Sequence, residues 1–84
     1  MNLTFAPQAW EDYHYWRENS SRVVERIHEL IKDVLRHAYQ GIGKLELLKH
    51  AMRGYWSRRI TAEHRMVYKV VEGAELIAQL RYHY

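Results

Sequence analysis

The sequence contains no cysteine in its 84 residues. Disulfide bonds, thiolate metal ligands and thiol nucleophiles are therefore excluded, and the absence fits a reducing compartment. Long hydrophobic runs are also missing, since no stretch approaches the ~18 apolar residues that a membrane helix needs. The opening MNLTFAPQAW has neither the basic region nor the continuous apolar segment of a signal peptide. We therefore expect a cytoplasmic protein that does not associate with membranes.

Common catalytic and ligand-binding motifs are missing as well. The six histidines show no H-x-H, H-x3-H or H-E-x-x-H spacing, so we expect no metal site and no cofactor. Gly41 and Gly43, within HAYQGIGK, lack the spacing of dinucleotide- and phosphate-binding loops, and they predict a connector. No serine lies in the nucleophile-elbow context that a Ser/His/Asp hydrolase requires.

The net charge of +3 is distributed unevenly along the chain. Residues 1–43 carry five Lys/Arg and six Asp/Glu, whereas residues 44–84 carry eight and four. The basic half also contains Trp56 and four tyrosines. Basic and aromatic side chains together suit a polyanion whose bases can stack. Charge alone leaves open a slightly basic domain with no nucleic-acid role.

The first half of the chain predicts one short strand and two helices. Leu3 and Phe5 alternate with polar residues, and Pro7 ends this strand or opens a helix. Aromatic residues then recur at helical spacing over residues 8–17. A second helix follows the capping side chains of residues 19–21, because apolar residues recur there along one helix face. These apolar positions are Val23, Val24, Ile27, Leu30, Ile31, Val34 and Leu35.

The second half predicts strands. In RGYWSRRITAEHRMVYKVV, residues 53–71, two alternating stretches flank a polar corner at residues 62–64, as in an antiparallel hairpin. A last strand is predicted from Glu75 to the C-terminus, with Tyr82 turned into the core. The order predicts a single α+β domain over residues 1–84, with two N-terminal helices packed on one face of a mainly antiparallel twisted sheet. For so small a core, a stable dimer or a wrapping partner would be unsurprising.

The predicted hairpin brings Arg59 and Arg65 together. Its register places both on the sheet face away from the helices, which we expect to be exposed and to carry Lys69 and His83 as well. Two guanidinium groups held on a rigid sheet form a phosphate-binding site. The alternative is that these arginines only make a solvated face more soluble.

RNA can be cleaved without a metal because its own 2′-hydroxyl is the nucleophile. The reaction needs a base for that hydroxyl, an acid for the departing 5′-oxygen and cations for the charge on the phosphorane. Glu46 and His83 are candidates for the base and the acid. The Arg59/Arg65 pair supplies the cations, with Lys49 as a further candidate.

Four ordered motifs carry a family resemblance: LKH at 48–50, YWSRRIT at 55–61, EHRMVY at 63–68 and RYHY at 81–84. Over essentially its whole length the chain resembles the YoeB (Txe) family of bacterial toxins, in the RelE/ParE superfamily. The resemblance implies a RelE-like, microbial-ribonuclease-like fold and an endoribonuclease that cuts mRNA in the A site of the ribosomal 30S subunit. It also implies a cognate YefM/Phd-type antitoxin and a toxin homodimer, whose interface the sequence does not identify.

The resemblance also implies a role for individual residues. The family's general base falls on Glu46, its general acid on His83 and its phosphate-stabilising arginine on Arg65. The substrate contacts fall on Lys49, Arg59 and Tyr84.

One departure from the family pattern concerns the backbone around the general base. Prolines flank the glutamate in the family, whereas Leu45 and Leu47 flank Glu46 here. Of the roles that the resemblance implies for individual residues, the role of Glu46 is therefore the least secure, because it depends on the orientation of its side chain.

Two other functions stay open. One is a ParE-like gyrase inhibitor, which should lack the Glu/Arg/His set. The other is a non-catalytic RNA- or ribosome-binding module, which would tolerate loss of His83.

Overall fold

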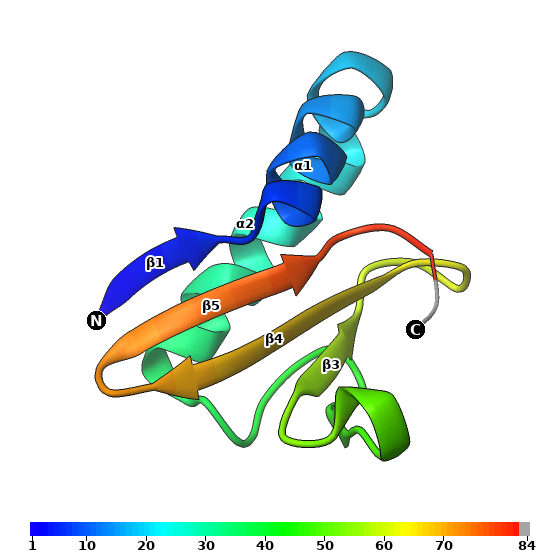
Figure 1. The fold of residues 1–84 in the computed structure, drawn as a ribbon. Coiled ribbons are helices and arrows are strands. Elements are labelled where there is room, and N and C mark those ends of the chain that lie inside the picture. The colour runs from blue at the N-terminus through cyan, green and yellow to red at the C-terminus, as the bar shows by residue number, and fades with distance from the viewer. Residues whose placement is uncertain (83–84) are drawn as a thin grey trace.

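The computed structural model describes residues 1–82 of the chain; His83 and Tyr84 are outside the description. A short strand comes first, two helices follow, and the remaining strands complete the fold (Figure 1). The elements are β1 (Asn2–Phe5), α1 (Pro7–Asn19), α2 (Ser21–Arg36), β2 (Glu46–Leu47), the 3-10 helix η1 (His50–Met52), β3 (Trp56–Arg59), β4 (Arg65–Val71) and β5 (Ala74–Gln79). The predicted order of helices and strands is confirmed, and η1 is an addition to it.

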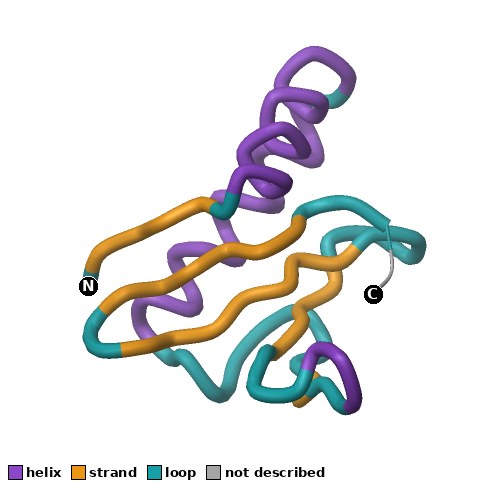
Figure 2. Tube along the Cα trace, in the orientation of Figure 1, coloured by secondary structure: helices purple, strands orange, loops and turns teal. Residues whose placement is uncertain are grey.

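The strands form one five-stranded sheet in the order β1-β5-β4-β3-β2. The β1–β5 pair is parallel, and the other neighbours are antiparallel. Both helices belong to the same side of the sheet, and α2 runs behind β1 and β5 in the view of Figures 1 and 2. The predicted α+β fold, with two helices on one face of a mainly antiparallel sheet, is therefore confirmed. Within residues 1–82, none of the helices has the length and apolar character of a membrane span.

Both helices begin where the sequence signals their start. Pro7 opens α1, where its missing N–H would have had no partner in any case. Ser20 precedes α2 with an extended backbone, and its Oγ accepts a 3.2 Å hydrogen bond from the N–H of Val23. This bond satisfies one of the donors that the first helical turn leaves unpaired. The connector between α2 and β2 contains no helix or strand, as Gly41 and Gly43 predict.

The hydrophobic core lies between the helices and the sheet. Most of the predicted stripe of α2 belongs to this core, but Leu35 is 38% exposed, so its expected place there is wrong. β4 contributes Met66 and Tyr68, which alternate with Arg65 and Val67 as expected. Burying one large apolar side chain contributes about 1.5–3 kcal/mol, so this layer holds the two halves of the chain together. The buried members are Ala9, Trp16, Val23, Ile27, Leu30, Ile31, Val34, Ile60, Met66, Tyr68, Ile77 and Leu80.

The last strand differs from its prediction. β5 ends at Gln79 instead of continuing to the C-terminus, and Tyr82 is 59% exposed, so its expected place in the core is wrong. Leu80 is the buried residue. Its N–H donates to Oδ2 of Asp12 at 3.0 Å, and its C=O accepts from Nε1 of Trp16 at 2.8 Å. The strand stops there because α1 takes the backbone groups that would otherwise extend the ladder.

Candidate active site

The register of β3 and β4 places Arg59 directly opposite Arg65. Because Met66 and Tyr68 belong to the core, Arg65 projects from the other face of the sheet. Arg59 projects from that face too, since directly paired residues share a face. The arginine pair is therefore present as predicted. The expected exposure of this face is wrong for Arg65, which is 6% exposed, while Arg59 and Lys69 are half-buried.

Some N–H donors of these two guanidinium groups have no acceptor among residues 1–82. Buried N–H groups without a hydrogen-bond partner among residues 1–82 include Nε and Nη1 of Arg65 and Nε of Arg59. In the same part of the chain, the ion pairs involve other arginines. An unsatisfied buried donor costs about 1–3 kcal/mol, and more when the group is charged. The geometry therefore suits an anion whose oxygen atoms accept from both guanidinium groups.

Glu46 lies on the same face as the arginine pair. It is in β2 and pairs with Ser57 of β3, which is two residues from Arg59. Glu46 is therefore a diagonal neighbour of Arg59, at a distance of ~7–8 Å that long side chains can span. Leu45 packs against the core, whereas Leu47 is exposed. The pairing with β3 and the anchoring of Leu45 constrain the Glu46 backbone where the family has prolines.

The other predicted site residues are less closely connected to the pair. Lys49 is exposed and immediately precedes η1, and none of its described contacts joins it to Arg59 or Arg65. His83 and Tyr84 lie outside the described residues, so their roles stay predictions. The residue before them, Tyr82, accepts a 3.1 Å hydrogen bond at its C=O from the N–H of Arg65. The C-terminal segment therefore reaches the arginine pair one residue before His83, which explains why Arg65 is not on an open face.

Arg58 is a buried anchor to which the sequence reasoning gave no role. Its side chain is fully buried and forms an ion pair with Asp33. It also donates to the carbonyl oxygens of His37 at 2.6 Å and Gln40 at 2.9 Å, and to the Tyr68 hydroxyl at 3.1 Å. Burial would raise the pKa of Asp33, but the hydrogen bonds from Arg58 and from the N–H of Ile42, with the charge of Arg58, outweigh burial and lower that pKa. The sequence feature that could have indicated this burial is the alternation of the strand, in which Arg58 shares a side with the apolar residues Trp56 and Ile60.

Arg81 is another residue near the site without a predicted role. Its guanidinium carbon lies 3.4 Å from the centroid of the Tyr15 ring and 4.7 Å from that of Tyr82. Its Nε is buried and has no hydrogen-bond partner among residues 1–82. Contacts between a cation and an aromatic face contribute ~0.5–2 kcal/mol, so Arg81 helps to hold the C-terminal segment against α1. The sequence feature that could have indicated a role for Arg81 is its position in the RYHY motif at 81–84.

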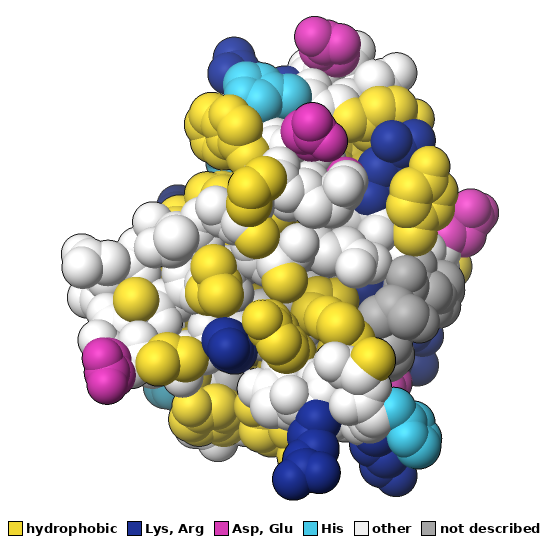
Figure 3. All heavy atoms as spheres, viewed as in Figure 1, with side chains coloured by type: hydrophobic (Ala, Val, Ile, Leu, Met, Phe, Trp, Pro, Cys, Tyr) yellow, Lys and Arg dark blue, Asp and Glu magenta, His cyan; other side chains and the backbone are white. Residues whose placement is uncertain are grey.

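The face of the sheet opposite α2 carries both hydrophobic and basic side chains. Figure 3 shows hydrophobic side chains over the strands, with Lys or Arg side chains among them and along the lower edge. Val71, which lies on the same face of β4 as Arg65 and Lys69, is 48% exposed. A face of this composition suits a polyanion or a protein segment with both apolar and acidic residues.

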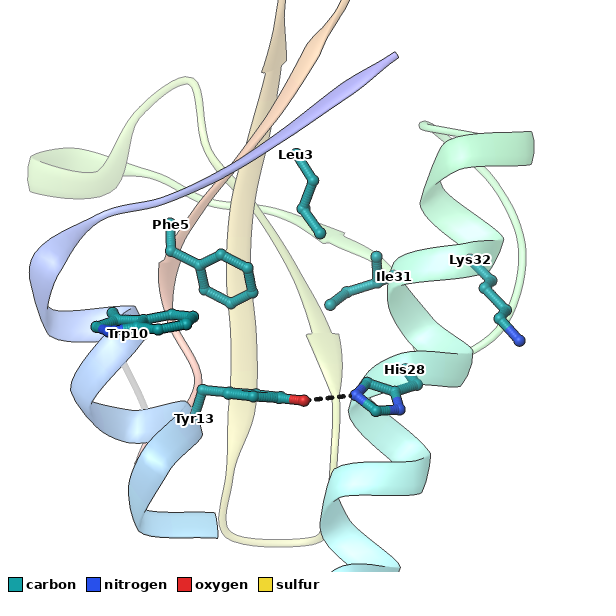
Figure 4. A pocket seen from close by; sticks show the side chains of 7 residues that line it. All are labelled: Leu3, Phe5, Trp10, Tyr13, His28, Ile31 and Lys32. Carbon is teal, nitrogen blue, oxygen red and sulfur yellow. Dashed lines mark hydrogen bonds between the residues drawn. The ribbon is translucent and has the colours of Figure 1, made fainter. Parts of the chain in front are cut away.

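A cavity of about 380 Å³ lies on the helix side, between α1, α2 and β1 (Figure 4). Mostly hydrophobic side chains line it, and the Tyr13 hydroxyl and Nε2 of His28 form a 2.8 Å hydrogen bond there. The arginine pair projects from the other face of the sheet, so this cavity is separate from the pair. Within residues 1–82, no cluster of three or more His, Cys, Asp or Glu side chains is arranged to hold a metal ion.

Comparison with known sequences assigns the chain to a family. The family model described as YoeB-like toxin of bacterial type II toxin-antitoxin system matches residues 5–84. Toxin YoeB of Escherichia coli strain K12 is 52% identical over 84 residues, which cover 100% of both chains. Toxin YoeB of Streptomyces coelicolor is 48% identical, again over 100% of both chains.

Solved structures agree with this assignment. A YoeB/ParE toxin from Agrobacterium tumefaciens is 45% identical, with a TM-score of 0.95 over 100% of both chains. A chain of the heterotetrameric YoeB-YefM complex from Staphylococcus aureus is 48% identical, with a TM-score of 0.92 over 100% of this chain and 98% of that one. A YoeB dimer from the same organism is 49% identical, with a TM-score of 0.93 and the same coverage. The chain belongs to the YoeB family of toxins of bacterial type II toxin–antitoxin systems.

Proposed function

We propose that this toxin is a ribosome-dependent endoribonuclease that cuts mRNA in the A site of the 30S subunit and thereby inhibits translation in the cytoplasm. The reaction begins with attack of the 2′-hydroxyl on the adjacent phosphorus, and it ends when the P–O5′ bond breaks. Glu46 removes the proton of the 2′-hydroxyl, and His83 donates a proton to the departing 5′-oxygen. Arg65 stabilises the negative charge that develops on the phosphorane.

The observation that carries this proposal is the Arg59/Arg65 pair, whose buried N–H groups include three without an acceptor among residues 1–82. Two like charges side by side repel each other, and a buried donor without an acceptor adds a further cost. An RNA phosphate removes both costs, because it brings negative charge and several acceptor oxygens. The phosphorane carries more charge than the ground-state phosphate, so the pair stabilises it more strongly and accelerates the reaction.

Glu46 lies on the correct face for the general base. Its diagonal position relative to Arg59 leaves room for a ribose between the carboxylate and a phosphate held by the arginines. Lys49 and Arg59 contact the RNA backbone, and Tyr84 stacks on a base. The position of Lys49 at the exposed start of η1 is compatible with a contact to a neighbouring phosphate.

The toxin is neutralised by a YefM/Phd-type antitoxin. An acidic and partly apolar segment of that antitoxin pairs with Arg59 and Arg65 and covers exposed apolar surface of the same face, such as Val71. This placement occupies the phosphate site and buries additional hydrophobic surface. The toxin also forms a homodimer, as in the YoeB dimer from Staphylococcus aureus.

The test uses ribosomes that hold a defined mRNA codon in the A site. One mRNA is all-ribose, and the other has 2′-deoxynucleotides in that codon only. We expect the toxin to cut the first and leave the second intact, because the second lacks the nucleophile. Efficient cutting of the deoxy codon would refute the mechanism, and absence of cutting in both would refute the proposed activity.

Arginine variants test the site itself. We expect Arg65→Ala to lower the cleavage rate ~10²–10³-fold, the usual loss when a charge-stabilising donor is removed. Arg36→Ala is the matched control, because Arg36 is an exposed arginine at the end of α2. Thermal unfolding of both variants verifies that they fold. Equal cleavage by Arg65→Ala and Arg36→Ala would show that the arginine pair is not the catalytic phosphate site.

A further inference from the structure

The three residues before His83 are each held by a different contact. The backbone of Leu80 is bonded on both sides by Asp12 and Trp16 of α1. The guanidinium group of Arg81 lies over the ring of Tyr15. These contacts hold Leu80 and Arg81 against α1.

Tyr82 is held by the turn between β3 and β4 and by the first residue of β4. The N–H of Tyr82 donates to Nδ1 of His64 at 2.8 Å, and its C=O accepts from the N–H of Arg65 at 3.1 Å. Tyr82 has a φ of 64°, in the left-handed region. This conformation costs a residue other than glycine roughly 1–2 kcal/mol, so the two hydrogen bonds are needed to maintain it.

His64 is itself firmly placed. Its C=O accepts from the N–H groups of Ile60 at 2.9 Å and Thr61 at 3.2 Å, and its own N–H donates to the Thr61 hydroxyl at 3.2 Å. Its ring packs edge-on against Trp16, with centroids 4.8 Å apart. Because Nδ1 accepts the bond from Tyr82, the ring is neutral and its proton is on Nε2.

We propose that His64 is a positioning residue for the reaction, which acts through Tyr82 on the general acid. This inference rests on the proposed function, in which His83 protonates the 5′-oxygen. The neutral Nδ1 of His64 keeps Tyr82, the residue that precedes the proposed acid, in its left-handed conformation. Without that acceptor, Tyr82 returns to an ordinary backbone conformation. The acid is then misplaced, while the arginines and Glu46 stay where they are.

Two substitutions separate the acceptor from the ring. His64→Phe keeps an aromatic ring against Trp16 but has no acceptor for the Tyr82 N–H. His64→Asn places its Oδ1 where Nδ1 was, so it keeps the acceptor but loses the ring. If His64 only stabilised the fold through packing, activity would follow stability and the phenylalanine variant would be the better enzyme. The positioning role predicts the opposite order of activity.

The experiment measures single-turnover cleavage of ribosome-bound mRNA at a series of toxin concentrations, together with thermal unfolding of each variant. For His64→Phe we expect a maximal cleavage rate ~10–100-fold below that of the unmodified toxin, because a small misplacement of a reacting group causes a loss of this size. The toxin concentration that gives half of the maximal rate should not change. His64→Asn should be within ~3-fold of the unmodified rate, although it unfolds at a lower temperature than His64→Phe. His64→Gln, whose amide lies one bond further out, is a second variant without a correctly placed acceptor.

His83→Ala, alone and combined with His64→Phe, completes the set. If His64 acts through His83, the two losses are not additive, and His64→Phe has little further effect once His83 is replaced. Full activity of His64→Phe, or additive losses, would overturn the positioning role while the proposed function stands. If His83→Ala cuts as fast as the unmodified toxin, the assigned acid is wrong, and the proposed mechanism fails together with this inference.

Discussion

Replacing Glu75 by glutamine should remove a pH dependence from the stability of this fold. Glu75 lies in β5 on the helix side of the sheet, its side chain is fully buried, and neither carboxylate oxygen has a hydrogen-bond partner among residues 1–82. Burial raises the pKa of Glu75 from 4.5 to about 7, against the charge of Arg58, which lowers it. Glu75 is therefore protonated in the folded protein at a pH at which it is ionised in the unfolded chain.

The direction and size of the effect follow from this difference in proton binding. Between pH 4.5 and about 7 the folded state binds one more proton at Glu75 than the unfolded state does. Its contribution to the free energy of unfolding is complete below the lower value and is lost as the pH rises through the upper value. Each pKa unit corresponds to 1.36 kcal/mol, so the loss across this window is about 3 kcal/mol. For a chain of this size, such a loss lowers the melting temperature by on the order of 15 °C.

The assay is urea unfolding, followed by circular dichroism at fixed protein concentration, from pH 5 to pH 8.5. The variant and the unmodified protein share every other titratable group, so the quantity of interest is the difference between their free energies of unfolding at each pH. That difference should shift by about 3 kcal/mol in favour of the variant as the pH rises. Glu72→Gln is the matched control, because Glu72 is an exposed glutamate in the turn that precedes β5, and its difference should not change.

A difference between Glu75→Gln and the unmodified protein that is independent of pH would refute this reasoning. It would mean that Glu75 titrates alike in the folded and unfolded chain. A shift in the opposite direction would also refute it, because it would require the ionised carboxylate to be stabilised in the fold. The absolute stability of Glu75→Gln at a single pH does not enter the comparison.

Two further predictions concern the connector and the start of α2. Arg58→Lys should lower the free energy of unfolding by on the order of 3 kcal/mol, because one ammonium group cannot replace the donors that hold Asp33 and three carbonyl oxygens of the connector. A loss below ~0.5 kcal/mol in urea unfolding, the level of an ordinary surface change, would contradict this. Ser20→Ala should cost about 1 kcal/mol through loss of the helix cap, whereas Ser20→Gly should cost only a few tenths. Equal melting temperatures for Ser20→Ala and the unmodified protein would contradict the capping role.

Local patterns in the sequence were sufficient for most of the elements and for the arginine pair. The apolar stripe of residues 23–35 and the serine before it predicted α2, because helical periodicity and capping depend on residues a few positions apart. The alternation on both sides of the turn at residues 62–64 predicted β3 and β4. It also placed Arg59 beside Arg65, since the register of a hairpin is set by its own turn.

Contacts between distant parts of the chain could not be predicted in this way. The alternation of the last strand suggested that it continues to the C-terminus, but Asp12 and Trp16 of α1 take the backbone groups of Leu80 and end the ladder at Gln79. The burial of Arg58 and Glu75 depends on which elements pack above them, and the hydrogen bond between His64 and Tyr82 joins residues 18 positions apart. The sequence by itself determined the elements, the family and the candidate site residues, because these depend on local spacing and on motifs. Only the tertiary structure decided which charged groups are buried, which pKa values shift and how the C-terminal segment is held, because those properties come from packing between elements.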